Sequence, residues 1–202
     1  MNDGGGSAVY NCPIYYGDAY PLLPDFKDLS PGYSDLSALQ EPQLIYDRRH
    51  LVFNLINQIR SANGVNNLYL DDKLNSLAQN YAEAMISQNF FGHVDNQGRN
   101  PTQRAAGYNI TEGVGENLAT NMNLTEGQLM LQRSPAHLAV MVDPSFTRVG
   151  LGIKQNSIGA YYLVQEYSSR DLNKYPLTTV ELLAIKNQIV YYLQSLYPSV
   201  KS

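Results

Sequence analysis

Three residues of types that bind metals or transfer protons stand out in the sequence: His93, Glu116 and His137. Two imidazoles and one carboxylate are enough to hold a divalent metal of the zinc type, with a fourth position left for water or a ligand. The same groups would serve equally as a proton-transfer pair. The intervals between them match no local metal-binding motif, so spacing alone also allows two structural histidines.

The stretch FFGHVDNQGRNP (residues 90–101) that contains His93 predicts a turn-rich segment after a helix. Asp95 is placed to accept backbone N–H groups in an Asx-type turn. We expect Arg104 to pair with Asp95 or with carbonyl groups near this segment. We expect Asn117 to hydrogen-bond to the backbone across the site, because a site built on loops needs such support to keep its geometry.

Other kinds of active site find little support in the sequence. It holds no P-loop and no dinucleotide-binding fingerprint, and Gly150-Leu151-Gly152 falls inside a strand pattern. Ser134 lacks the flanking glycines of a nucleophile elbow. Cys12, the single cysteine, lies far in sequence from the histidines, which argues against a Cys/His enzyme.

The composition is that of a folded globular protein: 44% of the 202 residues are hydrophobic and 16% are charged. The net charge of −4 argues against a nucleic-acid binder, since neutralising phosphates requires a basic face. No run of apolar residues approaches the length of a transmembrane helix. The first residues, MNDGGGSAVYNC, lack the basic start and apolar stretch of a signal peptide, so we expect either a cytoplasmic chain or one whose signal has been removed.

Hydrophobic periodicity predicts helices before a late pair of strands. The expected helices cover about 43–62, from Asp71 or Asp72 to about 89, 125–133 with a capping box at Thr125 and Gln128, a short segment from Pro135, and 178–196. The expected strands cover 147–154 and 160–168, with a turn between them. This order predicts an α+β class. We divide the chain into a Gly/Pro/Tyr-rich extended arm (1–45), a central domain (46–171) and a C-terminal helical extension (172–202).

Five ordered motifs together resemble a known family. They are Phe91-Gly92-His93-Val94-Asp95 with Gly98, Arg99, Pro101 and Arg104 following; Gly107-Tyr108; Gly115-Glu116-Asn117-Leu118-Ala119; Ser134-Pro135-Ala136-His137; and Asp143-Pro144-x-Phe146-Thr147-x-Val149-Gly150-x-Gly152. In this order and at these distances they resemble the CAP superfamily of cysteine-rich secretory proteins, antigen-5-type allergens and pathogenesis-related plant proteins. The likeness is greatest to its bacterial, disulfide-free branch of SCP-like extracellular proteins and covers about residues 46–170.

The resemblance implies a three-layer α-β-α sandwich with an antiparallel central sheet and a cleft lined by two histidines and two glutamates. His93 and His137 match the two family histidines, and Glu116 matches the glutamate of Gly-Glu-Asn. The second glutamate has no counterpart, because the family places it three residues after a tryptophan, where this chain has Leu131 and then Ser134. Two glutamates elsewhere are candidate substitutes, Glu126 and Glu166.

From the resemblance we expect a secreted, cell-surface or periplasmic protein, monomeric, that binds rather than reacts. Its cleft would consist of His93, Glu116 and His137, with Asn117, Asp95 and Arg104 around them, and would accept a small ligand, a lipid or peptide group, or a divalent cation such as zinc. The alternative is a metal-dependent, protease-like hydrolase, in which the two histidines and Glu116 hold the metal. Family membership does not decide between them, because one fold serves many functions.

Overall fold

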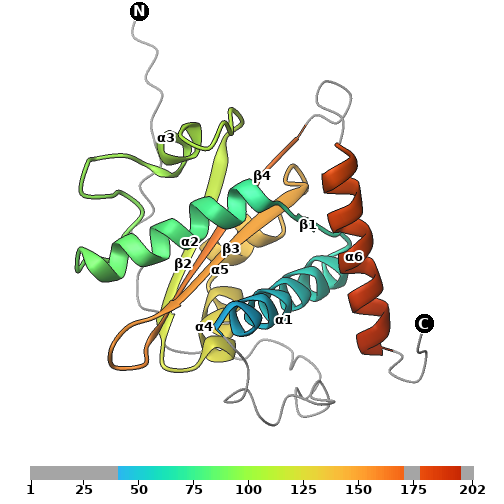
Figure 1. Cartoon of the computed structure of the whole chain (residues 1–202), viewed down its shortest axis with the longest axis horizontal. Helices are drawn as coiled ribbons and strands as arrows, with labels where there is room; N and C mark the ends of the chain where they lie inside the picture. The colour runs from blue at the N-terminus through green and yellow to red at the C-terminus, as the bar shows by residue number, and fades with distance from the viewer. Residues whose placement is uncertain (1–40, 171–177, 197–202) are drawn as a thin grey trace, which may run out of the picture.

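The structure is a computed structural model, which describes residues 41–170 and 178–196. Six helices and four strands follow one another in the described residues (Figure 1). In chain order they are α1 (Glu41–Ala62), β1 (Tyr69–Leu70), α2 (Asp72–Ser87), α3 (Pro101–Ala106), β2 (Val114–Asn121), α4 (Leu124–Arg133), α5 (Pro135–Met141), β3 (Arg148–Gln155), β4 (Tyr161–Ser168) and α6 (Thr179–Leu196).

The four strands form one sheet in the order β1-β3-β4-β2. Strands β3 and β4 are the predicted antiparallel pair, and β2 joins the other side of β4, also antiparallel. The two-residue strand β1 pairs with β3 in parallel, so the sheet is antiparallel except at that edge. Strand β2, which carries the Gly-Glu-Asn motif, forms the opposite edge of the sheet.

Helices cover both faces of the sheet, which makes three layers (Figure 1). Helices α1, α4 and α5 pack on one face, where residues such as Ile56, Leu131 and Leu151 form the larger core. Helix α2 crosses the other face and packs on β3 and β4, with Tyr81 and Val164 in the core between them. The described residues therefore confirm the predicted α+β class and the α-β-α sandwich.

Strand β3 shows why helix α2 can lie so close to the sheet. Its residues alternate between the two faces, so Leu151 points into the larger core while Gly150 and Gly152 face α2. A Cβ atom built on Gly150 would lie 2.0 Å from the backbone carbon of Leu74, and one on Gly152 would lie 2.1 Å from the carbonyl oxygen of Ala78. Only glycine leaves room for the helix backbone at these two positions.

Side chains at the helix ends fix where two of the helices begin. Asp71 caps α2, as predicted, by accepting hydrogen bonds from the backbone N–H groups of Lys73 and Leu74. Helix α4 starts differently from the prediction, because Asn123 caps it by accepting from the N–H of Glu126. Asparagine is as good an N-cap as the predicted threonine, and it comes first along the chain.

Only part of the predicted division of the chain into segments lies within the described residues. Residues 41–45, assigned to the extended arm, belong to α1, and the remainder of the arm (1–40) lies outside the described residues. Helix α6 matches the C-terminal helix expected over 178–196. None of the described helices is long and apolar enough to cross a membrane.

The close contact at β3 leads to a prediction about stability. We expect Gly150→Ala or Gly152→Ala to lower the free energy of unfolding by about 3 kcal/mol or more, since overpacking usually costs 1–3 kcal/mol and here the clash is with backbone. Urea unfolding followed by circular dichroism measures this. Gly113→Ala is the control, because nothing lies within 4 Å of its added Cβ. Equal unfolding midpoints for all three variants would contradict the proposed close packing.

Candidate functional site

The site lies around β2, the edge strand, and draws residues from both faces of the sheet. Glu116 and Asn117 are neighbours on β2, so their side chains point to opposite faces. His93 comes from the segment between α2 and α3, on the α2 side, whereas His137 belongs to α5, on the other side. Burial lowers the pKa of His137, and the imidazole of His93 lowers it further. The site is therefore built around a strand, and not only on the loops we expected to support it.

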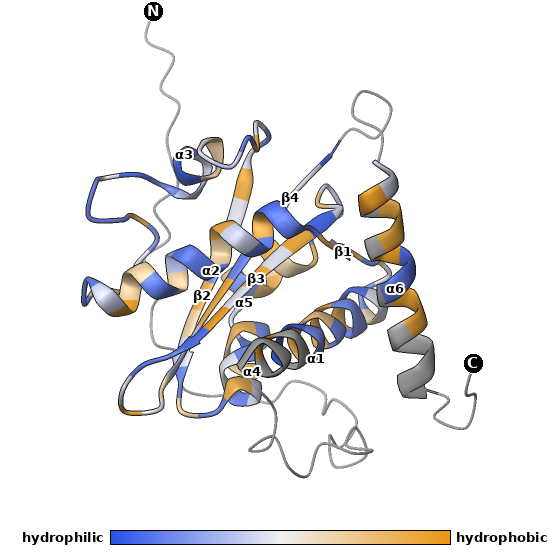
Figure 2. Ribbon diagram, viewed as in Figure 1, coloured by the Kyte–Doolittle hydropathy of each residue, from blue (hydrophilic) through white to orange (hydrophobic). Residues whose placement is uncertain are grey.

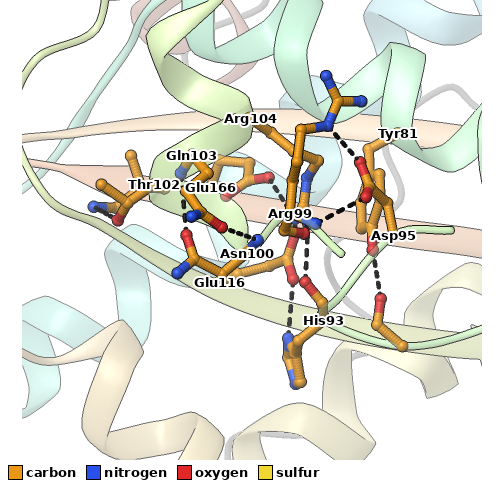
Figure 3. A network of polar contacts seen from close by, with 12 residues as sticks. Tyr81, His93, Asp95, Arg99, Asn100, Thr102, Gln103, Arg104, Glu116 and Glu166 are labelled. Atoms are coloured by element: carbon orange, nitrogen blue, oxygen red, sulfur yellow. Dashed lines mark hydrogen bonds and ion pairs between the residues drawn. The ribbon is translucent and has the colours of Figure 1, made fainter. Parts of the chain in front are cut away.

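Glu116 lies at the base of the site and is fully engaged (Figure 3). Its side chain is 1% exposed, and its Oε1 lies 2.8 Å from Nδ1 of His93. Its Oε2 accepts a hydrogen bond from Nη2 of Arg104. Both carboxylate oxygens thus face a hydrogen-bond donor, which is what a carboxylate buried away from water requires.

A second buried carboxylate lies beside the first. Glu166 on β4 is the cross-strand partner of Glu116, so both side chains point to the α2 face. Glu166 is completely buried, and its Oε1 lies 3.6 Å from the Arg104 guanidinium. Neither oxygen of Glu166 has a hydrogen-bond partner among the described residues. Two carboxylates therefore share a single arginine.

Sharing one arginine changes the pKa values of Glu116 and Glu166. Burial raises the pKa of Glu116 to about 7, against the lowering effect of Arg104. Burial raises the pKa of Glu166 well above its ordinary value, and the charge of Glu116 raises it further. Because one cation balances only one anion here, we assign the proton at neutral pH to Glu166, the carboxyl group without hydrogen-bond donors.

Arg104, on the short helix α3, connects this pair to the rest of the site (Figure 3). Its Nη1 donates to the carbonyl oxygens of His93, at 2.7 Å, and of Arg99, at 3.1 Å. The guanidinium also lies over the ring of Tyr81, 3.5 Å from its centroid. Of the two predicted partners for Arg104, the carbonyl groups are confirmed and Asp95 is not one of its contacts in the structure.

Asp95 instead shapes the segment that carries His93. Its Oδ1 accepts from the backbone N–H groups of Gln97 and Arg99, both at 2.9 Å, which forms the predicted Asx-type turn. Its Oδ2 accepts from Nε of Arg99 at 2.8 Å. Burial alone would raise the pKa of Asp95, but these hydrogen bonds together outweigh it and lower the pKa. Asp95 and Arg104 together hold the backbone from His93 to Arg99, and the hydroxyl of Tyr81 donates to the carbonyl oxygen of Gly92 just before it, so the position of His93 is determined from both sides.

The other face of β2 positions His137. The side chain of Asn117 donates to the carbonyl oxygen of His137 at 3.0 Å, which is the predicted hydrogen bond across the site. Asn117 also donates to Gln165 on β4 at 3.2 Å. Nδ1 of His137 lies 2.8 Å from the hydroxyl oxygen of Ser134. Burial lowers the pKa of both imidazoles, so His93 and His137 are neutral at pH 7.

The geometry does not present Glu116 as a direct zinc ligand. Each of its oxygens already faces a donor, Nδ1 of His93 or Nη2 of Arg104. Among the residues that the structure describes, no three His, Cys, Asp or Glu side chains are arranged to hold a metal ion.

The two candidate substitutes for the missing glutamate lie in very different places. Glu126 is on the surface, 53% exposed, where it faces Arg133 at 3.9 Å. Glu166 is at the site, but it lies beneath Glu116 and does not reach the surface. Glu166 and Val164 are two residues apart on β4 and so share a face of the sheet, but nothing in that strand indicates which residue of β2 lies opposite Glu166.

A pocket of about 180 Å³ opens on the α2 side, next to Arg104. Two of the predicted ligand-binding residues, Asp95 and Arg104, line it. Its walls otherwise combine aromatic rings, including Tyr81 and Tyr108, with amide side chains such as that of Asn80. The six predicted site residues therefore lie in three places. His93, Glu116 and His137 lie at the edge of β2, and the side chain of Asn117 points to the face of the strand opposite Glu116. Asp95 and Arg104 line this pocket.

We predict that Glu166→Gln stabilises the protein at alkaline pH. A carboxyl group whose pKa is higher in the folded state contributes stability below its ordinary pKa, here 4.5, and this stability is lost as the pH rises through the folded value. Glutamine avoids that loss and has nearly the same shape. We expect the variant to exceed wild type by about 1–3 kcal/mol at pH 8, with a smaller difference at pH 5.

Urea unfolding at both pH values measures this difference. The two histidines add a pH dependence of the opposite sign below about pH 6.5, because their pKa values are lowered on folding. That contribution is present in both proteins and cancels in the comparison. Glu126→Gln, at the exposed glutamate, serves as the control and should change little. A wild type and a Glu166→Gln variant with parallel pH profiles would mean that the buried proton is not on Glu166.

We predict a larger effect, of opposite sign, for Arg104→Met. Removing the guanidinium leaves two buried carboxyl groups without a cation, which should cost about 3–5 kcal/mol. It also releases the carbonyl groups of His93 and Arg99, so amide hydrogen exchange over residues 92–99 should become faster. Arg99→Met is the matched control: its side chain is 50% exposed, and an exposed ion pair contributes about 1 kcal/mol or less. Equal destabilisation by the two variants would contradict the central role of Arg104.

Comparison with known proteins agrees with this architecture. The model of the cysteine-rich secretory protein family (CAP) matches residues 53–167, more than half of the chain. No curated protein sequence matches the chain.

Solved structures with the same fold include an outer surface protein of Borrelia burgdorferi, which is 20% identical with a TM-score of 0.58 over 62% of this chain and 94% of that one. An extracellular SCP-domain protein of Bacillus anthracis has the same identity and TM-score, over 66% of this chain and 45% of that one. A cysteine-rich secretory protein of Staphylococcus aureus is 11% identical with a TM-score of 0.50, over 62% of this chain and 39% of its own. At these identities the likeness concerns the fold alone. The family match, the ordered motifs and the sandwich lead to one conclusion: the chain belongs to the CAP family of cysteine-rich secretory proteins.

Proposed function

We propose that this protein is a non-catalytic binding module of the CAP family that accepts a small ligand at the edge of β2. One observation carries the proposal: both oxygens of Glu116 are engaged, one by His93 and the other by Arg104. A carboxylate in this position is a structural anion. It cannot serve as a general base without breaking a buried ion pair, which would leave Arg104 poorly compensated.

The imidazole pair lacks the other components of a hydrolase. Nδ1 of His93 faces a carboxylate and Nδ1 of His137 faces Ser134. The histidine of a nucleophilic pair is normally oriented by a third group, often a carboxylate. Ser134 precedes Pro135 at the start of α5, and the buried carboxylate of Glu116 bonds to His93 and not to His137.

The surface around His93 supports a ligand that has both polar and apolar parts. His93 itself is 43% exposed at the side chain. Its neighbours Phe91 and Val94 are 48% and 55% exposed, which is unusual for side chains of this kind grouped so closely. A neutral His93 that donates from Nδ1 to Glu116 offers a ligand its Nε2 as an acceptor, and the adjacent pocket at Arg104 adds amide and aromatic groups. A short peptide or a small lipid with a polar head fits this chemistry.

A location outside the cytoplasm is part of the proposal. Two of the similar structures come from proteins described as an outer surface protein and an extracellular protein. Their identity to this chain is low, so they support the location by analogy of fold. We propose a secreted or surface-associated protein that presents its ligand site to the surroundings of the cell.

Calorimetry and nuclear magnetic resonance test the proposal together. Zinc titrated into wild type and into His93→Ala/His137→Ala at neutral pH should give the same small heat, and neither protein should hydrolyse a peptide and ester library. Amide chemical shifts should then be followed while short peptides, monosaccharides and medium-chain fatty acids are added. We expect at least one class to shift resonances around His93 and His137 and to lose its effect in the double variant.

Two results would overturn the proposal. Zinc-dependent turnover that the double substitution abolishes would establish the metal-dependent hydrolase instead. Ligand-induced shifts that are unchanged in the double variant would move the binding surface away from the imidazole pair. The Asn80→Ala variant, altered in the neighbouring pocket, separates these two surfaces, since it changes the pocket while leaving both histidines in place.

A further inference from the structure

Strand β2 leaves its outer edge open along much of its length. Its inner backbone groups pair with β4, and its outer ones point away from the sheet. The N–H of Val114 is one of the outer groups, since it donates to the hydroxyl oxygen of Thr102 at 3.2 Å. Because the direction alternates along an antiparallel strand, the backbone groups of Glu116, Leu118 and Thr120 also point outward. Within the part of the chain that the structure describes, no hydrogen bond reaches these outer groups.

The opposite side of the sheet is closed by side chains. The short β1 covers only the start of β3, so the outward backbone groups of Leu151 and Ile153 lie beyond it. Asn75 accepts from the N–H of Leu151 at 2.9 Å, and Nε of Arg49 donates to the carbonyl oxygen of Leu151 at 2.6 Å. Gln79 accepts from the N–H of Ile153 at 3.1 Å and donates to its carbonyl oxygen at 3.3 Å. The fold therefore satisfies the outer groups of β3 and leaves those of β2 unpaired, although exposed edges are normally protected.

The main chain of Glu116 reaches the surface at the open edge of β2. The residue as a whole is 8% exposed, whereas its side chain is 1% exposed, so its exposed area belongs mainly to the backbone. Thr120, further along the same edge, is an exposed residue. Strand β2 contains no Lys or Pro, the residues that often keep edge strands from pairing, and Figure 2 shows hydrophilic and hydrophobic residues mixed along it. The edge of β2 can therefore accept a further strand.

The two histidines of the site lie on either side of this open edge. His93 is on the α2 face of the sheet, and His137 is on the face covered by α5. A residue that pairs with Glu116 directs its side chain to the same face, that of His93, and its neighbours direct theirs to the face of His137. An extended peptide on β2 would therefore place alternate side chains beside the two imidazoles. The exposed Phe91 and Val94 add apolar surface on the His93 side.

We propose that the ligand of this site is an extended peptide, which pairs with the edge of β2 as an additional strand of the sheet. The inference rests on the proposed binding function and names the class of its ligand. The outward groups at positions 116, 118 and 120 recur at every second residue, about 7 Å apart, as do the groups along one edge of a peptide strand. Pairing with all three positions requires a peptide of about five residues or more.

Other occupants fit the edge of β2 less well. Two copies of the chain paired through β2 would bring helix α5 and the segment that carries His93 against the same elements of the other copy. A single extended segment needs only the roughly 4.8 Å that separates neighbouring strands. Fatty acids and monosaccharides lack donors and acceptors that alternate at the peptide spacing, so they would leave the edge unpaired.

Amide hydrogen exchange of the full chain, followed by nuclear magnetic resonance, tests the pairing. The probe is a blocked peptide with the sequence Lys-Thr-Val-Thr-Val-Thr-Lys. In the free protein the outward N–H groups of Glu116 and Thr120 should exchange faster than the N–H groups of Asn117 and Ala119, which face β4. With free peptide at roughly ten times its Kd, exchange at the two outward groups should slow by about tenfold, because it then requires release of the peptide. Exchange at the two inward groups should change little.

A proline substitution on the edge tests the same hydrogen bonds from the protein side. Thr120→Pro removes one outward N–H and no bond to β4, and proline is tolerated where the N–H of an edge strand faces solvent. Thr120→Ala is the matched control, since it loses the same side chain and keeps the N–H. We expect the proline variant to bind the peptide about tenfold more weakly, the effect of one lost hydrogen bond, and the alanine variant to bind it as wild type does. Equal urea unfolding midpoints show that both variants fold.

Methylation of the probe gives a further test that leaves the protein unchanged. A peptide N-methylated at every second residue keeps the N–H groups along one of its edges, so it should bind as the unmethylated peptide does. A peptide N-methylated at every residue has no N–H to donate to β2, so its binding should be lost. This pair of peptides decides the question even where the proline variant does not fold.

Any of three results would refute the peptide strand. One is slow exchange at Glu116 and Thr120 in the free protein, which would mean that residues 1–40 or a second copy already covers the edge. Another is a fully methylated peptide that binds as tightly as the unmethylated one. The last is a probe that fails to slow exchange at Glu116 and Thr120, whether or not it shifts the resonances of His93 and His137.

Failure of the peptide strand is distinguishable from failure of the binding function on which it rests. Where a peptide, a monosaccharide or a fatty acid shifts the resonances of His93 and His137 without protecting the edge amides, the binding function stands and the peptide strand is refuted. Where ligand effects are unchanged in His93→Ala/His137→Ala, both are refuted.

Discussion

The ion pair between Arg104 and Glu116 is the interaction on which the arrangement of the site depends. It joins three parts of the chain that are far apart in sequence: α3, the edge strand β2, and, through the carbonyl oxygen of His93, the segment after α2. A buried ion pair gains little stability by itself, because removing both charges from water offsets their attraction. Here the ion pair fixes the position of helix α3, since only one placement of α3 satisfies both Glu116 and the carbonyl groups.

The glycines of β3 make this buried environment possible. Gly150 and Gly152 allow α2 to approach the sheet closely, and Gly150 pairs with Glu166 across the strands. The helix then covers the face of the sheet on which both carboxyl groups lie, and it brings the ring of Tyr81 over the Arg104 guanidinium. A wider gap between helix and sheet would admit water, and the carboxyl groups would then ionise independently. The protonation of the two glutamates therefore depends on the close packing at the two glycines.

Much of the fold could be predicted from the sequence, because its signals are local. The alternation of Val149 and Leu151 predicts β3, and Asp71 marks the start of α2. The positions of His93, Glu116 and Asn117 followed from motifs that resemble the family. The pairing of Glu116 with Glu166 was not predictable, because the register between β2 and β4 joins residues 50 positions apart. No local pattern states which residue of one strand lies opposite a given residue of another.

The buried charges of Glu116 and Arg104 are separate from the exposed surface around His93, and this separation affects what the proposed ligand would contact. Glu116 and Arg104 neutralise each other within the protein, so a ligand at the surface meets neutral imidazoles and not an unpaired charge. Binding of the proposed ligand then need not break the ion pair, and exposed side chains near His93, among them Phe91 and Val94, are available at the surface. Since these residues lie on a segment held by Arg104 and Asp95, new side chains would be presented on the same backbone. A buried ion pair beneath an exposed surface is therefore compatible with the proposed binding role, and that role requires no catalytic group.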